Sequence, residues 1–364
     1  SATLINVHFR YGGNSFVGPM LSAVNGSTIS LTGGEIAFSR LDGMQSDARS
    51  VLSASSVAFH GNLAWGFNAG GLTHHLSENV FADGAQGARI AMPQTVRAQG
   101  NLFKDLSILA MSIHPGVTRN GFEDTTVVRT STGGIMGVEI MGFPSVVTAP
   151  AAWVGSSLPF VFRGQVIFNP GASLTVTDGA VLKALTNNAQ LLLGGGLDAL
   201  GSPAKPITFT SLNDDSVAGD TNGDGSVTSP VPGNWGFVRL DGSASSGTLI
   251  NVHFRYGGSS FVGTMLSAVN GSTISLTGGK LSHSQTDGIK SEGSSMISVS
   301  SVSFNGNLNW GLNVIGGRIP LLAGNTFTGV KGARVAVPQT IQANGNTFED
   351  LTSQAMEVHP GVTL

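Results

Sequence analysis

The chain has 364 residues, of which 52 are glycine and only 11% are charged, and its formal net charge is −3. With 40% hydrophobic residues it has enough apolar side chains for a large core, which excludes a disordered chain. The sequence has no basic run and no apolar run of roughly 18 residues, so we expect neither nucleic-acid binding nor membrane insertion in this segment. It also has no cysteine, which excludes disulfides and thiolate metal sites.

The beginning of the chain recurs later in the chain at an offset of 245 residues. Residues 3–34 are identical to residues 248–279 except at two positions, and the match continues to the HPGVT segments at 114–118 and 359–363. A repeat of this length is typical of a tandem array of similar units.

The repeat predicts the domain organisation. Residues 1–144 are expected to form the carboxyl-terminal part of one unit and residues 145–364 the next unit, in which 248–364 repeats 3–119. Because both ends hold part of a unit, we expect the chain to be a piece of a longer tandem protein.

A shorter period runs inside each copy. Phenylalanines recur about every 22 residues, and an asparagine often stands two positions before them. Residues 5–11 alternate apolar and polar side chains, as a strand with one apolar face does. The period and the strands together predict an all-β fold, a right-handed parallel β-helix with about 22 residues per coil.

The same pattern predicts two ladders that run from coil to coil. The first is an internal stack of aromatic rings, formed by Phe9, Phe38, Phe59, Phe81 and Phe103 and continued by Phe122. The second is a ladder of asparagine amides at a turn, each bonding the next coil, formed by Asn79, Asn101 and Asn120 and in the second copy by Asn325 and Asn346.

Several segments resemble a known kind of domain. They are Phe9–Gly13, Pro170–Gly179, Leu197–Ser211, Asp214–Gly225, Pro232–Gly236 and Phe254–Gly258. They are similar to coils of the right-handed parallel β-helix (pectin-lyase-like) repeat domains of large secreted bacterial and archaeal surface proteins. The resemblance implies the fold but not an activity, because this architecture carries lyases, hydrolases, adhesins and passive stalks.

An acidic loop in the second half resembles the first part of a calcium-binding loop. Asp220, Asn222 and Asp224 stand at alternate positions before Gly225, as ligands do in such loops, but Val231 replaces the closing glutamate. The candidate metal ligands are therefore Asp214, Asp215, Asp220, Asn222 and Asp224. Oxygen ligands favour Ca²⁺ over zinc or copper, and we expect the ion to stabilise the loop, with an ordinary Asp/Asn/Gly turn as the alternative.

We assign no catalytic residue from the sequence. The aspartates kept in both copies, Asp42/Asp287 and Asp105/Asp350, lie about three coils apart, too far for an acid pair. His60 becomes Asn305 in the second copy, so a catalytic role for it is dismissed.

One strand in each copy carries a polar pair that we expect to point outward. The pairs are His8 with Arg10 and His253 with Arg255. A general base and an oxyanion partner could be built from them, but we interpret them as a solvated face that contacts glycans. The neighbouring Tyr11 is expected at a core or edge position, because it continues the apolar phase of its strand.

These features predict a structural or adhesive segment of a giant tandem-repeat extracellular surface protein or fibre, a stalk or attachment element stabilised by calcium. The expected partners are neighbouring units of the same protein, end-to-end copies of the chain, and cell-surface or extracellular glycans. The alternative is a polysaccharide lyase, a glycoside hydrolase or a glycan-binding module on the same fold.

Overall fold

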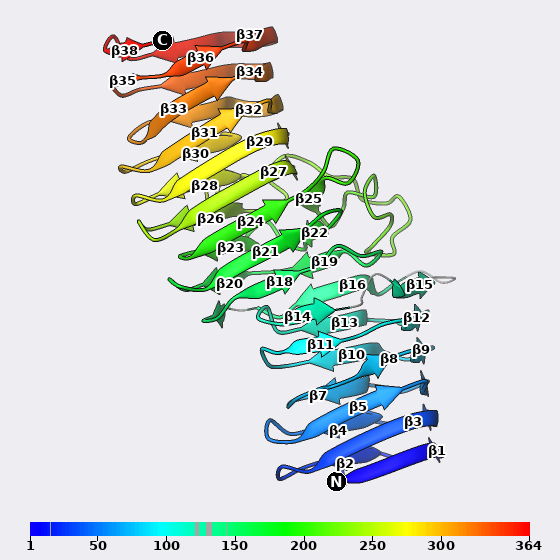
Figure 1. Cartoon of the computed structure of the whole chain (residues 1–364). Helices are drawn as coiled ribbons and strands as arrows, with labels where there is room; N and C mark the ends of the chain where they lie inside the picture. Colours follow the sequence, from blue (N-terminus) through cyan, green and yellow to red (C-terminus); the bar gives the residue numbers. More distant parts are fainter. Residues whose placement is uncertain (15, 121–123, 129–132, 143) are drawn as a thin grey trace. The chain divides into compact units, whose positions relative to one another are not determined.

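A computed structural model of the chain describes residues 1–14, 16–120, 124–128, 133–142 and 144–364. These residues form an all-β parallel β-solenoid of about 15 turns, with about 23 residues per turn and no helix (Figure 1). The predicted fold is thus confirmed, with slightly longer turns than expected. Within the described part of the chain, no helix has the length and apolar character needed to cross a membrane.

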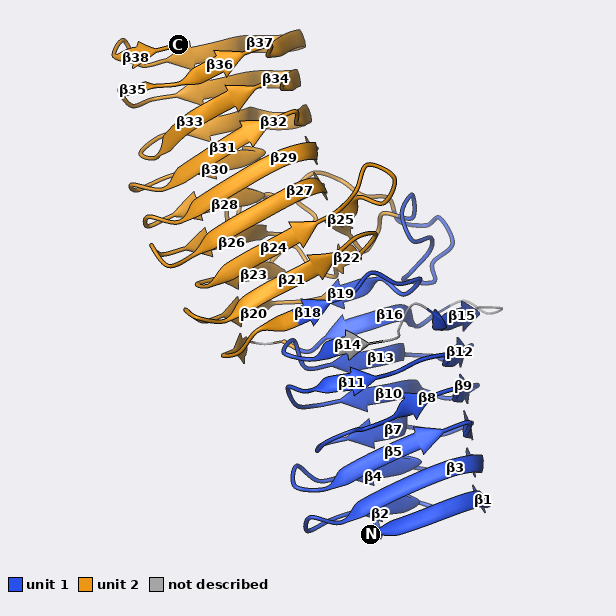
Figure 2. Ribbon diagram, in the orientation of Figure 1, with its two compact units in different colours: residues 1–141, 152–161, 215–228 blue, residues 142–151, 162–214, 229–364 orange. Residues whose placement is uncertain are grey.

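The solenoid divides into two compact units (Figure 2). The first comprises residues 1–141, 152–161 and 215–228, and the second comprises 142–151, 162–214 and 229–364. The division predicted after residue 144 follows the sequence repeat, whereas these units follow spatial contacts, so the tandem organisation stays a prediction.

The strands up to residue 140 belong to the first unit. They are β1 (Ala2–Arg10), β2 (Leu21–Ala23), β3 (Thr28–Ala37), β4 (Met44–Ser46), β5 (Val51–Ser55), β6 (Ala58–His60), β7 (Trp65–Ala69), β8 (Leu76–Ser77), β9 (Val80–Ala82), β10 (Gln86–Ile90), β11 (Thr95–Arg97), β12 (Leu102–Lys104), β13 (Leu109–Ile113), β14 (Thr118–Asn120), β15 (Thr126–Val128) and β16 (Ile135–Ile140).

The remaining strands follow in the same order along the chain. They are β17 (Ser145–Val147), β18 (Ala151–Trp153), β19 (Phe160–Phe162), β20 (Gln165–Phe168), β21 (Ser173–Thr177), β22 (Val181–Ala184), β23 (Gln190–Leu193), β24 (Gly196–Leu200), β25 (Ile207–Ser211), β26 (Phe237–Asp241), β27 (Ser246–Arg255), β28 (Leu266–Val269), β29 (Thr273–Ser282), β30 (Ile289–Ser291), β31 (Met296–Ser300), β32 (Ser303–Val314), β33 (Arg318–Ala323), β34 (Thr326–Val335), β35 (Gln339–Thr340), β36 (Gln342–Asn344), β37 (Thr347–Val358) and β38 (Val362–Thr363).

In the second unit the strands stack in parallel columns, each strand pairing with its counterpart one turn later. One column runs β20, β23, β26, β28 and β30, and another runs β21, β24, β27, β29, β31 and β33. Side chains alternate across each strand: in β29, Ile274 and Leu276 are buried whereas Ser275 and Thr277 are exposed. The apolar residues of successive turns therefore meet inside the coil, and the hydroxyls face water.

An internal aromatic stack forms as predicted for part of the phenylalanine series. Phe59, Phe81 and Phe103 are each 1% exposed, and their ring centroids follow one another at 4.8 Å and 5.0 Å. In the second unit, Phe304 and Phe327 stack at 4.6 Å. Such spacing matches the distance between paired strands, so each ring packs on the ring one turn away. Phe122 lies outside the described residues.

Phe38 is not part of this stack, so its predicted position is wrong. The strand register pairs Phe9 with Ile36 and Ile36 with Phe59, so Ile36 fills the interior on this turn. Phe38 follows the end of β3 with a φ of 57°, a left-handed backbone that turns its ring outward. There it stacks on Tyr11 at 5.0 Å, and Tyr11, also left-handed, is 79% exposed rather than in the core.

The asparagine ladder forms as predicted. Asn79 is fully buried; its Oδ1 accepts the Val57 N–H at 3.0 Å and its amide donates to Asn101 Oδ1 at 3.0 Å. In the second copy, Asn325 donates to Asn346 Oδ1 at 2.9 Å. Each amide thus satisfies buried backbone groups and joins one turn to the next. The side chain of Asn120 is outside the described part.

The two phenylalanine environments predict unequal effects of truncation. Phe81→Ala is expected to destabilise the protein by about 3–5 kcal/mol, because it removes a ring from a packed interior. Phe38→Ala is expected to cost about 1 kcal/mol or less, since this ring is 41% exposed and its counterpart in the second copy is His283. Urea unfolding of both variants measures the difference, and equal losses would contradict the outward placement of Phe38.

Candidate metal centre and polar clusters

Three aspartates of the loop between β25 and β26 come together. Asp215, Asp220 and Asp224 are partly exposed, and each offers one carboxylate oxygen within 4.8 Å of the other two. Like charges at this distance repel unless a cation lies among them or one group is protonated. The cluster could therefore hold a metal ion, and it contains three of the five predicted ligands.

The carboxylate of Asp220 shapes this loop. Its Oδ1 accepts the N–H groups of Gly223 at 2.6 Å and Asp224 at 3.2 Å, and its Oδ2 accepts the N–H of Gly225 at 2.9 Å. The two glycines have φ values of 73° and 75°, so the backbone curls around the carboxylate in a conformation that favours glycine. The loop is thus a closed turn with the side chains at alternate positions directed inward.

In two of these side chains, one oxygen atom receives no hydrogen bond. Asp224 Oδ2 accepts from Thr228 Oγ1 at 2.5 Å and from the Asn222 amide at 2.9 Å. The other oxygens, Asp224 Oδ1 and Asn222 Oδ1, are buried and have no hydrogen-bond partner. Buried oxygens normally find a partner, and a bound cation is a partner for both.

Asp214 does not belong to this cluster, although it was predicted as a ligand. Its side chain is 2% exposed, and its Oδ2 lies 3.2 Å from Arg255 Nη1 and accepts the Thr210 hydroxyl at 2.7 Å. Asp214 Oδ2 is thus already engaged by a cationic side chain and a hydroxyl. Asp214 therefore anchors the strand face at Arg255 instead.

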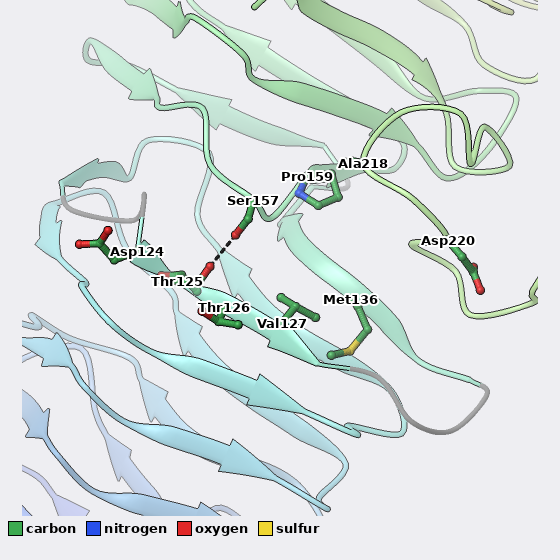
Figure 3. Close-up of a pocket in the computed structure, with 9 residues that line it drawn as sticks. All are labelled: Asp124, Thr125, Thr126, Val127, Met136, Ser157, Pro159, Ala218 and Asp220. Carbon is green, nitrogen blue, oxygen red and sulfur yellow. Dashed lines mark hydrogen bonds between the residues drawn. The ribbon is translucent and has the colours of Figure 1, made fainter.

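A cavity of about 600 Å³ in the first unit opens beside the aspartate loop (Figure 3). Its wall includes Thr126 and Met136 of the solenoid, with Ala218 and Asp220 of the loop on another side. Ser157 also lines it and donates to the Thr125 carbonyl at 2.5 Å, which ties the 152–161 segment to the solenoid wall. This cavity could not be predicted from the sequence, because its lining residues lie far apart along the chain.

The outward pair of the first copy belongs to a charged cluster centred on Glu35. Glu35 is buried, and its Oε2 accepts from Arg10 Nε at 2.6 Å and lies 3.3 Å from His8 Nδ1. His60 Nε2 contacts the other oxygen. Burial alone raises the pKa of Glu35, but the hydrogen bonds from Arg10, His8 and His60 outweigh it and lower the pKa from 4.5 to about 2.

The second copy has the same His/Arg pair, but the charged residue on the neighbouring strand is basic instead of acidic. His253 and Arg255 occupy the positions of His8 and Arg10, while Lys280 replaces Glu35 and Asn305 replaces His60. Burial, and then the charges of Arg255 and Lys280, lower the pKa of His253. The outward direction expected for both pairs is consistent with the buried Phe254 between His253 and Arg255.

Asp42 and Asp287 have the same structural role in the two copies. Asp42 accepts the Trp65 N–H at 3.0 Å and the Asn68 amide at 2.7 Å. Asp287 accepts the N–H of Trp310 at 3.1 Å, in the equivalent place. Both carboxylates therefore accept hydrogen bonds from the solenoid turn that follows them.

Glu35 is the residue that sequence reasoning missed. Comparing the copies discards it, because the equivalent residue is Lys280, and the same comparison dismissed His60. A usable signal was present: in both copies a charged side chain stands one turn after the His/Arg pair, at the paired register position.

The low pKa of Glu35 predicts acid lability at the first strands. Its ionised form stabilises the fold, so this contribution is complete above about pH 4.5 and is lost as the pH falls towards about 2. At neutral pH, Glu35→Gln is expected to reduce local stability by on the order of 1–2 kcal/mol, because the partners are half-exposed and screened by water. Near pH 2 the variant and the wild type should become equal.

Hydrogen exchange of the β1 and β3 amides at both pH values measures this effect. The matched control is Glu78→Gln, which changes an exposed carboxylate of the same unit. Identical exchange of wild type and Glu35→Gln at neutral pH would contradict the prediction.

No protein-family model matches this chain, and neither a curated protein nor a solved structure matches it. The fold is therefore known from the structure alone. Function has to be inferred from the geometry of the clusters described above.

Proposed function

We propose that the chain is a structural segment of a large extracellular surface protein or fibre. In this proposal the solenoid is stabilised by calcium and acts as a stalk or attachment element, not as an enzyme. The proposal agrees with the resemblance of its segments to repeat domains of secreted bacterial and archaeal surface proteins. It also agrees with the fold, since a solenoid grows by repeating one turn without requiring new contacts.

One observation carries this proposal: the copies keep the supporting residues and change the reactive ones. Asp42 and Asp287 accept equivalent backbone hydrogen bonds in the two copies, and the asparagine ladder occurs in both. The cluster best suited to acid–base chemistry does not recur, because Glu35 becomes Lys280. A catalytic surface needs a fixed set of proton-transfer groups, whereas a support needs only the packing and the caps.

We assign the metal of the aspartate loop as Ca²⁺. The available donors are carboxylate and amide oxygens only, which suit calcium and not zinc or copper. A bound ion would neutralise Asp215, Asp220 and Asp224 and satisfy the buried oxygens of the loop. Its role in this proposal is to hold a long loop in one conformation.

The partners that we propose are like units, including end-to-end copies of the chain, and extracellular glycans. Strand edges of a parallel solenoid are ready to pair with another such edge. The exposed hydroxyls of strands such as β29 offer hydrogen bonds to sugars.

A substrate panel tests the proposal. Incubation with pectin, alginate, hyaluronan and heparin should give no unsaturated product by ultraviolet absorbance and no new reducing ends. Turnover that is lost in Glu35→Gln would instead identify a polysaccharide-active enzyme with the Glu35 cluster as its catalytic centre. Turnover lost in Asp124→Asn would place the active site in the cavity of the first unit, since Asp124 lines it.

A further inference from the structure

Residues 215–228 belong to a different unit from their neighbours in the chain. They are part of the first unit, whereas the chain on both sides of them belongs to the second. The residues before and after this segment are both fixed at Arg255. The Arg255 guanidinium Nη1 lies 3.2 Å from Asp214 Oδ2, and the Arg255 carbonyl accepts the indole N–H of Trp235 at 2.7 Å. We call residues 215–228 the strap, because both of its ends are held.

The backbone of the strap bonds to β16 and to Gly133 just before it. The Thr221 carbonyl accepts the Met136 N–H at 2.9 Å, and the Gly223 carbonyl accepts the Gly133 N–H at 3.2 Å. The Thr221 side chain is buried, and a Cβ at Gly137 would lie 3.4 Å from its methyl carbon. The strap therefore lies directly against the first half of β16.

The candidate calcium ligands alternate with these bonded residues along the strap. Asp220, Asn222 and Asp224 stand on either side of Thr221 and Gly223. Asn222 Oδ1 and Asp224 Oδ1 are buried and have no hydrogen-bond partner in the described part of the chain, which points to a bound cation. A cation that gathers the even-numbered side chains also fixes the backbone between them. It thereby fixes the two carbonyls that bond to β16 and Gly133.

We propose that calcium binding holds the strap against β16 and that loss of calcium releases it. This inference rests on the proposed calcium site and adds what the ion controls. The attached strap supplies Ala218 and Asp220 to the wall of the cavity of about 600 Å³, which Met136 also lines (Figure 3). Release removes that wall, so the cavity is complete only in the calcium-bound state. Because both ends of the strap stay held, its return to β16 is an intramolecular step with a high effective concentration.

Amide-resolved hydrogen exchange of the whole chain, with calcium or with EDTA, tests the proposal. The Met136 N–H is the reporter, because its acceptor lies on the strap. On the same strand, the N–H of Ile135 donates to Ile108 and that of Val138 donates to Pro159, both outside the strap. With calcium at a hundred times its dissociation constant, Met136 exchange should slow by up to about a hundredfold. Exchange of Ile135 and Val138 should change by less than about twofold.

Calorimetric titration with calcium separates this inference from the calcium site itself. Calcium binding together with slower Met136 exchange supports both. Calcium binding without a change at Met136 would overturn the strap and leave the calcium site in place. Absence of calcium binding would overturn both.

Two neutral variants test whether attachment of the strap and calcium binding are coupled. Thr221→Gln puts a longer side chain into the buried place beside Gly137 without changing a ligand, so it should detach the strap. Because the coupling is reciprocal, its calcium affinity should fall by about tenfold, and Met136 should exchange fast even with calcium. Ser226→Gln changes an exposed residue of the strap and should leave calcium affinity within about twofold of the wild type. Equal calcium affinities of the two variants would overturn the coupling.

Discussion

Calcium at millimolar concentration is expected to raise the melting temperature of this protein, and EDTA to lower it. Asp215, Asp220 and Asp224 place three carboxylates within 4.8 Å, and without a cation their repulsion weakens the loop. A ligand that binds only the folded state adds about 2.7 kcal/mol at a hundred times its dissociation constant. The loop should also resist limited proteolysis only when calcium is present.

Asp224→Asn is the sharpest variant for this experiment. It keeps the size of the side chain, and an amide oxygen can still accept the Thr228 hydroxyl, but it removes the charge that holds the ion. The variant should lose the response to calcium, whereas Asp198→Asn, an exposed aspartate on β24, should keep it. A melting curve of the wild type that does not change with EDTA or calcium would remove the metal site.

Asn79→Ala is expected to be among the most damaging single substitutions, at about 2–4 kcal/mol. It leaves the buried Val57 N–H without an acceptor and the Ala54 carbonyl without the amide that donates to it at 3.1 Å. Each such group loses its partner where water does not reach it. Loss of the Asn101 contact adds to this effect, because one turn is no longer joined to the next.

The repeat offers a matched experiment. Asn325→Ala should cost about as much as Asn79→Ala, since Asn325 makes equivalent bonds to Val302 and Asn346. Asn344→Ala is the control, because Asn344 is exposed on the same solenoid. Urea unfolding compares the variants, and a cost for Asn79→Ala no larger than that for Asn344→Ala would contradict a supporting role of the ladder.

Much of the fold was predictable because, in a solenoid, residues with the same structural role recur in the sequence once per turn. The recurring phenylalanines and asparagines predicted the interior stack and the amide ladder. Phe38 was misplaced because residue spacing does not reveal where a strand ends in a left-handed residue. In the second copy His283 replaces Phe38. A polar imidazole is unfavourable inside an aromatic stack, so this replacement indicated that the side chain at this position points outward.

The candidate sites were less predictable, because they depend on which side chains meet across turns. The loop spacing identified Asp220, Asn222 and Asp224, but not that Asp214 would turn to Arg255, a partner 41 positions later in the chain. Glu35 was overlooked because comparing copies selects what they share. The charge difference at that position is the feature that distinguishes the two faces chemically.

The near-identity of the two copies has a consequence for how this chain reaches its native state. β1 pairs with β3 in the register in which β27 pairs with β29, with Thr3 opposite Ser30 and Thr248 opposite Ser275. When the whole chain refolds from denaturant, each strand meets two partners of almost equal fit, and the wrong pairing is a kinetic trap within one molecule. Synthesis from the amino terminus avoids this competition, because β1 can find β3 before β27 and β29 exist.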